Sequence, residues 1–214
     1  MTPAPDDDLA LLHAWQAGER AAGRTLIARH YASVYRFFFS KVPEEACEDL
    51  TQATFEVVCR RRDAFRGGDA TFKAFLFGVA RMKLLEHIRK RRGVTFEPAE
   101  HSLADPRTEG SASSLLAERQ LEHLVSQALR GLSLDDQLLL ELQEYEQLTA
   151  RELAQLFEVP DGTMAGRIAR ARQRLREATE RLIADPELRD SVERDLDSCM
   201  RSIGDRLAHR LRRG

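Results

Sequence analysis

The chain of 214 residues lacks several features that define large classes of proteins. It has no run of eighteen apolar residues, which a membrane-spanning helix would need, so we expect no membrane span. Residues 1–8 are acidic and lack the basic-then-apolar order of a signal peptide, so we expect a cytoplasmic protein. Its three cysteines (Cys47, Cys59 and Cys199) have no C-x-x-C spacing and are predicted to be small buried residues rather than metal ligands or disulfides.

The residues on which most catalytic sites are built are also scattered. The six histidines have no metal-ligand spacing, and the sequence has neither a nucleophile motif nor a glycine-rich phosphate loop. Seven prolines and twelve glycines leave few turns, and long stretches have the apolar spacing of helices. The sequence therefore predicts an all-α protein that is not an enzyme, with no catalytic residues, no metal and no cofactor.

The formal net charge of −2 conceals an uneven distribution. Residues 1–93 carry 16 Lys and Arg against 12 Asp and Glu, whereas residues 94–117 carry one against four. A nearly neutral chain with local basic patches binds free DNA poorly, because neutralisation of phosphates drives non-specific binding. If the protein binds DNA, we expect another protein to help it onto the duplex.

Composition divides the chain into four segments. Residues 7–93 are densely apolar at helical spacing and predict a small helical domain, whereas residues 94–114, rich in Pro, Gly and Ser, predict a flexible acidic linker. Residues 115–183 predict a second small helical domain. Residues 184–214 place apolar side chains at steps of three or four and predict an amphipathic C-terminal helix.

Residues 148–172 are the most informative part of the chain, because they predict two short helices joined by a tight turn. Thr149 and Glu152 form a T-x-x-E capping box, which starts the first helix. Pro160 suits the break between the helices, and Asp161 is the expected N-cap of the second.

The second of these helices combines an apolar stripe with many arginines. The apolar residues follow at steps of four, three and four and predict a buried face: Met164, Ile168, Ala171 and Leu175. The arginines occupy much of the remaining surface: Arg167, Arg170, Arg172, Arg174 and Arg176. An arginine-rich helix alone is often only a solvated face, but the capped helix, the turn and the second helix together predict a helix-turn-helix that places one helix in the major groove of DNA.

Two further helices in the first domain are predicted over residues 44–61 and about 71–92. With the helix-turn-helix, they make the chain resemble the bacterial sigma factors of the sigma-70 family, in the extracytoplasmic-function (group 4) type. The segments that carry the resemblance lie in order along about residues 9–182: 48–58, 72–81 and 87–92 in the first domain, and 129–133 and 148–172 in the second. The resemblance implies region 2 of such a factor at 7–93 and region 4 at 115–183, with residues 184–214 outside the two-domain pattern.

This resemblance implies a function in transcription initiation. The protein would bind core RNA polymerase, at the coiled coil of the largest subunit and at the flap, direct it to promoters and help to open the DNA. Double-stranded promoter DNA and the melted −10 strand would be its nucleic-acid partners. The resemblance also suggests sequestration by an anti-sigma factor.

The resemblance assigns site residues in three groups. The polymerase-binding helix contributes Asp49, Leu50, Gln52, Phe55 and Glu56, of which the polar ones form a stripe beside apolar positions that face the core. The −10 element would be bound by cations for phosphates and by an aromatic side chain for a flipped base: Phe65, Arg66, Lys73, Arg81, Lys83, His87, Arg89 and Lys90. The −35 element would be bound by Arg151, Thr163, Arg167, Arg170 and Arg172.

The sequence departs from the family pattern at a few positions. Ala165 and Gly166 stand where a basic residue and a serine are common, and Phe75 and Met82 replace a tryptophan and an asparagine. Two other functions remain open from sequence. One is a helix-turn-helix regulator that binds its operator without polymerase, and the other is a helical adaptor whose C-terminal helix recruits a partner.

Overall fold

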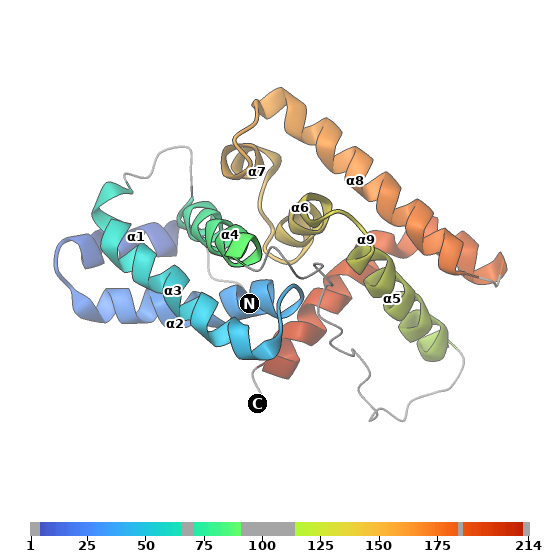
Figure 1. Cartoon of the computed structure of the whole chain (residues 1–214), viewed down its shortest axis with the longest axis horizontal. Coiled ribbons are helices and arrows are strands. Elements are labelled where there is room, and N and C mark those ends of the chain that lie inside the picture. Colours follow the sequence, from blue (N-terminus) through green and yellow to red (C-terminus); the bar gives the residue numbers. More distant parts are fainter. Residues whose placement is uncertain (1–4, 66–70, 91–113, 184–185, 212–214) are drawn as a thin grey trace. The chain divides into compact units, whose positions relative to one another are not determined.

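The computed structural model of the chain describes residues 5–65, 71–90, 114–183 and 186–211 (Figure 1). Within these ranges the regular structure is entirely helical, which confirms the predicted all-α class. The helices group into two compact units, one made of residues 1–101 and 154–158 and the other of residues 102–153 and 159–214. The predicted linker, 94–114, lies almost wholly outside the described residues, as does Arg66.

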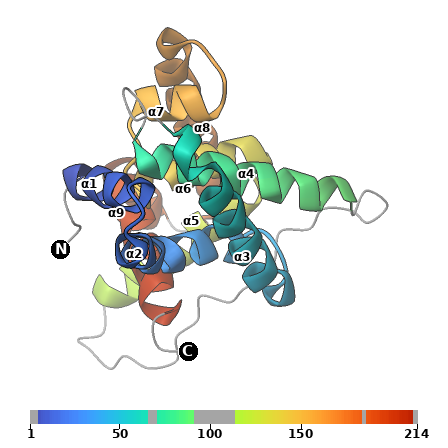
Figure 2. The ribbon, with the colours of Figure 1, turned by 90° about the vertical axis from the view of Figure 1, so that its left-hand side faces the viewer.

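The first unit is a bundle of helices in which short turns join α1 to α2 and α2 to α3 (Figure 2). Its elements are α1 (Pro5–Gln16), α2 (Arg20–Phe39), α3 (Glu44–Arg61), the short 3-10 helix η1 (Arg62–Ala64) and α4 (Phe72–Lys90). Helix α3 has the predicted bounds. Helix α4 begins after Thr71, whose hydroxyl accepts a hydrogen bond from the Ala74 amide at 3.2 Å and so caps the first turn.

Apolar side chains at helical spacing hold this bundle together. Helix α2 packs against α1, α3 and α4. Its inner face and theirs supply fully buried residues, among them Leu12, Leu26, Val34, Phe38, Val58, Phe72, Leu76, Phe77 and Leu84. A polar anchor joins α1 to α2, because the Asp8 carboxylate contacts His30 Nε2 at 2.7 Å and Arg29 at 2.6 Å. The packing therefore fixes α3 and α4, which carry the predicted site residues of this unit.

The second unit carries the predicted helix-turn-helix. Its elements are α5 (Ser114–Arg130), α6 (Leu134–Glu144), the first four residues of α7 (Ala150–Leu156), α8 (Asp161–Leu182) and α9 (Pro186–Leu211). Helix α8 packs on α5 and α6, and α9 packs on α5, α6 and α8. The amphipathic C-terminal helix predicted from sequence is therefore present, and its apolar stripe is buried within this unit.

The capping of the two helices in the motif confirms one prediction and corrects another. The Thr149 amide donates to Glu152 Oε2 at 2.7 Å and the Glu152 amide donates to Thr149 Oγ1 at 3.3 Å, which is the predicted capping box. The prediction of Asp161 as N-cap is wrong: Pro160 occupies that position without a side-chain cap, and Asp161 is the first helical residue. Its carboxylate instead stabilises α8 by charge, because an acid in the first turn faces the positive end of the helix dipole.

None of the described helices is long and apolar enough to span a membrane.

Gly23 is required by close packing between α1 and α2. It is buried, and a Cβ placed on it would lie 2.5 Å from the Trp15 indole. We expect Gly23→Ala to lower the free energy of unfolding by about 1–3 kcal/mol, because the ring has to move out of a packed site. Gly78→Ala on α4 is the control: a Cβ there has nothing within 4 Å, so the variant should gain about 0.5–1 kcal/mol. Equal urea midpoints for the two variants would contradict the packing argument.

Candidate functional site

Helix α8 has a buried stripe and an exposed stripe. Met164, Ile168, Ala171 and Leu175 are all buried, as predicted. A second row follows the same steps of four, three and four on another side of the helix: Thr163, Arg167, Arg170 and Arg174. Thr163 and Arg170 are exposed and Arg167 is half-buried. The row therefore presents a hydroxyl and guanidinium groups along one line, which suits phosphates and base edges in a groove.

Near the end of this row, Arg174 is fixed by an acid on α6. Its Nε and Nη2 donate to the Asp136 carboxylate at 2.8 and 2.7 Å, a bidentate pair. Burial raises the pKa of Asp136, but the hydrogen bonds from Arg174 and Ser133 outweigh it, and the pKa lies below its usual value of 3.8. This pair holds α8 against the first turn of α6.

Arg172 is placed differently from the other predicted −35 residues. It lies on the opposite flank of the buried stripe, where it donates a short hydrogen bond to Glu144, an α6 residue that is only 6% exposed. Its Nε also lies 3.7 Å from Asp197 Oδ1 on α9. The guanidinium of Arg172 compensates a buried carboxylate that would be costly to leave unpaired, and its contact with DNA stays a prediction.

Arg151, the remaining −35 candidate, lies on the other helix of the motif. It is exposed, and its Nε is 3.9 Å from Asp161 Oδ2, a distance at which an exposed pair contributes little. Between the two helices, Glu158 has φ of 55°, in the left-handed region that favours glycine. The tight turn therefore forms without a glycine, at a backbone cost of about 1–2 kcal/mol.

Among the −10 candidates, Phe65 is held directly after η1 by packing and hydrogen bonds. Its ring centroid is 5.1 Å from that of Phe75, and both side chains are half-buried. Gln16 on α1 donates to the carbonyls of Phe65 and Arg62 at 2.9 and 2.6 Å. An aromatic pair with an accessible edge, on a fixed backbone, is suited to receiving a base. Arg66, which follows directly, lies outside the described residues.

The cations of α4 gather towards its C-terminal half. The first half of the helix is largely buried, since Phe72, Leu76, Phe77 and Ala80 are each no more than 1% exposed. Arg89 and Lys90 are exposed at the end of the helix, and the other predicted members are half-buried: Lys73, Arg81, Lys83 and His87. Lys83 also pairs with Glu86 at 2.9 Å.

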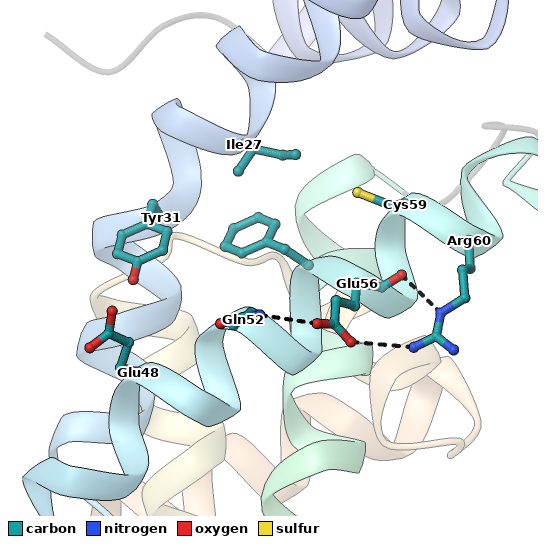
Figure 3. Close-up of a pocket in the computed structure, with 8 residues that line it drawn as sticks. Ile27, Tyr31, Glu48, Gln52, Glu56, Cys59 and Arg60 are labelled. Carbon is teal, nitrogen blue, oxygen red and sulfur yellow. Dashed lines mark hydrogen bonds and ion pairs between the residues drawn. The ribbon is translucent and has the colours of Figure 1, made fainter.

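The predicted polymerase-binding helix borders a pocket between α2 and α3 (Figure 3). Asp49, Gln52 and Glu56 are exposed along one side of α3, Leu50 is half-buried and Phe55 is buried. Gln52 donates to Glu56 at 3.2 Å, and Arg60 lies 3.6 Å from the same carboxylate. The structure thus brings together the polar members of the predicted group.

The pocket itself has a volume of about 520 Å³. Its base includes Phe55, which stacks on Tyr31 with ring centroids 6.1 Å apart, and its rim carries Glu48, Gln52, Glu56 and Arg60. An apolar base inside a polar rim is the usual form of a protein-docking site. Ile27 and Tyr31 come from α2 and were not predicted. Their i, i+4 spacing is the sequence signal that could have identified them, and in the structure Tyr31 is 40% exposed.

Two acids on α6, Asp136 and Glu144, were also missed by sequence reasoning. Each holds an arginine of α8 over a long sequence separation, which no local pattern reveals. In the described part of the chain, no group of three or more His, Cys, Asp or Glu side chains could hold a metal ion. Cys47 and Cys199 are buried, as predicted, and Cys59 is half-buried. Burial raises the pKa of Cys47 to about 12, so its thiol is inert.

Both units contain segments that match models of known protein families. Residues 26–94 match the family model for Sigma-70 region 2, and residues 122–175 match the model for Sigma-70, region 4. The chain is 28% identical to the RNA polymerase sigma-H factor of Pseudomonas aeruginosa, over 84% of this chain and 97% of that protein. It is 25% identical to the ECF RNA polymerase sigma-E factor of Escherichia coli K12, over 82% of this chain and 96% of that protein.

Two solved structures have similar folds. One is CnrH in complex with the cytosolic domain of CnrY, with 25% identity and a TM-score of 0.55, covering 79% of this chain and 94% of that chain. The other is the sigma factor RpoE in complex with the anti-sigma factor NepR from Bartonella quintana, with 24% identity and a TM-score of 0.52, covering 72% of this chain and 92% of that chain.

The bidentate pair between α6 and α8 gives a pH-dependent prediction. Because the pKa of Asp136 is lowered by folding, its stabilising effect is present above its ordinary pKa and is lost as the pH falls through the lowered value. We expect Asp136→Asn to cost about 1 kcal/mol at pH 7, since solvent screens the half-exposed Arg174. Urea unfolding at pH 7 and at about pH 3 should show the difference from wild type shrinking. Asp135→Asn, its exposed neighbour, is the control, and a pH-independent difference for Asp136→Asn would refute the pair's role.

Proposed function

The chain belongs to the sigma-70 family of RNA polymerase sigma factors, in its extracytoplasmic-function group, and we propose a role in that function for each of the surfaces described above. As a sigma factor it binds core RNA polymerase, directs it to promoters and promotes opening of the DNA. It acts in the cell interior, on DNA. We propose that it is an initiation factor with no catalytic step of its own.

Region 4 contacts the −35 element through the exposed row of α8. Arg170 supports this assignment most directly, because it is exposed on the same line as Thr163 and Arg167. Arg151, at the start of α7, is placed to contact a phosphate beside them. Arg172 and Arg174 instead hold α8 on α6 and α9 and act as positioning residues.

Region 2 binds the −10 element with α4 and the segment that precedes it. Phe65, supported by Phe75 and fixed by Gln16, is the candidate for stacking on a flipped base. Arg89 and Lys90 would neutralise phosphates of the same strand, and Lys73, Arg81, Lys83 and His87 line the helix before them. The cations and the aromatic pair thus divide backbone contact from base contact.

Helix α3 binds polymerase through its exposed polar stripe and the adjacent pocket. Asp49 and Glu56 give the stripe its acidic character, Gln52 lies between them, and the pocket offers an apolar base for a side chain of the partner. Leu50 and Phe55 contribute indirectly, because they pack α3 on the bundle.

We further propose domain limits of 7–93 and 115–183, and sequestration by an anti-sigma factor when the protein is inactive.

The observation that carries this proposal is the sorting of arginines on α8, because it leaves one row facing outward on a capped helix-turn-helix. We expect Arg170→Ala to lower promoter-dependent transcription by core polymerase about tenfold, and Arg167→Ala to have a similar effect, while polymerase binding is kept. Arg181→Ala, an exposed arginine in the last turn of α8, is the matched control and should behave as wild type.

This assay also separates the sigma factor from a regulator that acts alone. If Arg170→Ala abolished polymerase binding, the assignment of the row to DNA would be wrong. If the wild-type chain shifted a specific duplex by itself at moderate salt and gave no promoter-dependent transcript, the function as a sigma factor would be wrong.

The α3 stripe gives a second prediction, on the protein partner. We expect Asp49→Ala and Glu56→Ala each to weaken binding to core polymerase by about fivefold or more, since charge complementarity at a docking face sets both affinity and association rate. Stability should change by less than about 0.5 kcal/mol, because both side chains are exposed. Glu44→Ala, an exposed acid of α3 outside the stripe, is the control. Unchanged polymerase affinity in both stripe variants would overturn this assignment.

A further inference from the structure

Helix α1 lies outside the family match, yet it contacts the segment that carries the candidate base-binding ring. The match to Sigma-70 region 2 begins at residue 26, after α1 has ended at Gln16. Within the first unit, α1 packs on α2, on η1 and on α4. Phe65, the candidate for stacking on a flipped base, directly follows η1. The contacts of α1 with residues 62–65 therefore bear on the proposed −10 surface.

The last residue of α1 holds the backbone of this segment. Gln16 Nε2 donates to the Arg62 carbonyl at 2.6 Å and to the Phe65 carbonyl at 2.9 Å. A carboxamide nitrogen has two protons, so each proton serves one carbonyl. The Arg62 carbonyl also accepts a hydrogen bond from the Phe65 amide at 3.3 Å. Residues 62–65 are thus closed into a turn and fixed by a side chain 46 residues before Arg62 in the sequence.

The neighbouring Trp15 holds the same segment by its side chain. The guanidinium carbon of Arg62 lies 5.5 Å from the centroid of the Trp15 ring, a cation–π contact. Arg62 Nη1 also donates to the Cys59 carbonyl at 2.9 Å. The indole lies so close to Gly23 of α2 that a Cβ there would be 2.5 Å from the ring. One side chain of α1 therefore contacts both α2 and the start of the segment.

The other end of α1 is anchored on α2 by charge. Asp8 Oδ1 accepts a hydrogen bond from Arg29 at 2.6 Å, and Asp8 Oδ2 lies 2.7 Å from His30 Nε2. Asp7 pairs with the same arginine at 2.7 Å. Burial raises the pKa of Asp8, but the hydrogen bonds and charges of His30 and Arg29 outweigh it, and the pKa lies below its usual value of 3.8. Asp8 is therefore charged at neutral pH, and α1 is held at both ends.

A row of rings connects this anchor to the candidate base-binding ring. His30, the partner of Asp8, is 6% exposed, and its ring centroid lies 5.6 Å from that of Phe72 at the start of α4. The centroids of Phe72 and Phe75 are 6.4 Å apart, and Phe65 follows at 5.1 Å from Phe75. The anchor of α1 thus lies at one end of the row and Phe65 at the other.

We propose that α1 is a positioning element for promoter opening: Trp15 and Gln16 hold residues 62–65, and Asp8 holds α1, so that Phe65 is oriented to receive a base. This rests on the proposed function, in which Phe65 stacks on a flipped base of the −10 element. A site that is ordered on folding binds more tightly than one that has to be ordered on binding. The docking of α1 therefore sets how readily the DNA opens.

Hydrogen exchange in the free full-length chain tests the hold on residues 62–65. Gln16→Glu keeps the shape of the side chain and removes both donors. We expect the backbone amides of residues 62–65 to exchange about fivefold or more faster in this variant, measured by mass spectrometry, because the turn opens more often. His13→Ala, a change at an exposed residue of α1, is the control and should exchange as wild type does. Unchanged exchange in Gln16→Glu would overturn the positioning by α1.

The anchor is tested with Asp8→Asn, which removes the charge that binds α1 to α2. Trp15 is the only tryptophan of the chain, so quenching of its fluorescence by acrylamide reports on the docking of α1. We expect Asp8→Asn to raise the quenching constant about twofold and to speed exchange at residues 62–65, because the undocked form of α1 is more populated. Faster quenching without faster exchange would show that the anchor does not act on the segment and would overturn this part of the proposal.

Promoter opening is measured with core RNA polymerase and a promoter that the wild-type chain transcribes. The readout is the rate at which thymines of the −10 element become reactive to permanganate, which oxidises unpaired thymines. Gln16→Glu should lower this rate about fivefold, and polymerase affinity should change less than about twofold. Phe65→Ala should also lower the rate, and in that background Gln16→Glu should have no further effect, because it acts through Phe65. Fully additive effects would overturn this route.

The same experiment separates the positioning role from the proposed function. If Phe65→Ala opened the promoter at the wild-type rate, the role of Phe65 would be wrong, and the positioning of Phe65 with it. If Phe65→Ala slowed opening and Gln16→Glu did not, only the positioning by α1 would be wrong. Should Gln16→Glu lose its helical circular dichroism, Gln16→Ala removes the same donors without adding a charge and is judged by the same readouts.

Discussion

The buried stripe of α8 is the constraint on which the second unit depends. Met164, Ile168, Ala171 and Leu175 must all face the core, and this fixes the rotation of the helix about its axis. Once the rotation is fixed, each arginine has a determined direction. Arg170 points to solvent, whereas Arg172, two residues later, is turned towards the acids of α6 and α9. Apolar packing therefore decides which cations remain available for DNA.

The acids of α6 give this arrangement its specificity. Asp136 and Glu144 lie near the two ends of a short helix and bind arginines on opposite flanks of α8. Ion pairs that are buried or partly buried add little net stability, because desolvation offsets their attraction, but an unpaired buried carboxylate is strongly unfavourable. Alternative registers of α8 on α6 are thus penalised more than the native one is stabilised. Because Glu144 also forms an ion pair with Arg201, the position of α9 depends on the same register of α8 on α6.

The sequence was most informative where structure is set locally. The bounds of α3, the capping box of Thr149 and Glu152 and the buried stripe of α8 follow from spacing and hydrogen-bonding types within a few residues. It failed where distant segments decide. The partner of Arg172 is 28 residues away, and the pocket beside α3 needs Tyr31 from α2. The left-handed Glu158 was equally hidden, because tertiary packing imposes a conformation that its residue type disfavours.

The same sorting of charges bears on how the protein finds promoters. Affinity for DNA rises with the number of phosphates neutralised, so every arginine held by a carboxylate is removed from that number. Arg172 and Arg174 are held in this way, and the net charge of the whole chain is −2. Region 4 alone therefore has few cations with which to hold a duplex, and a weak, salt-sensitive contact is expected of it. Binding becomes strong only when the contacts at −35, at −10 and on polymerase are made together, because each then raises the effective concentration of the next. A sigma factor built in this way reads promoters as part of the polymerase and leaves bare DNA largely unoccupied.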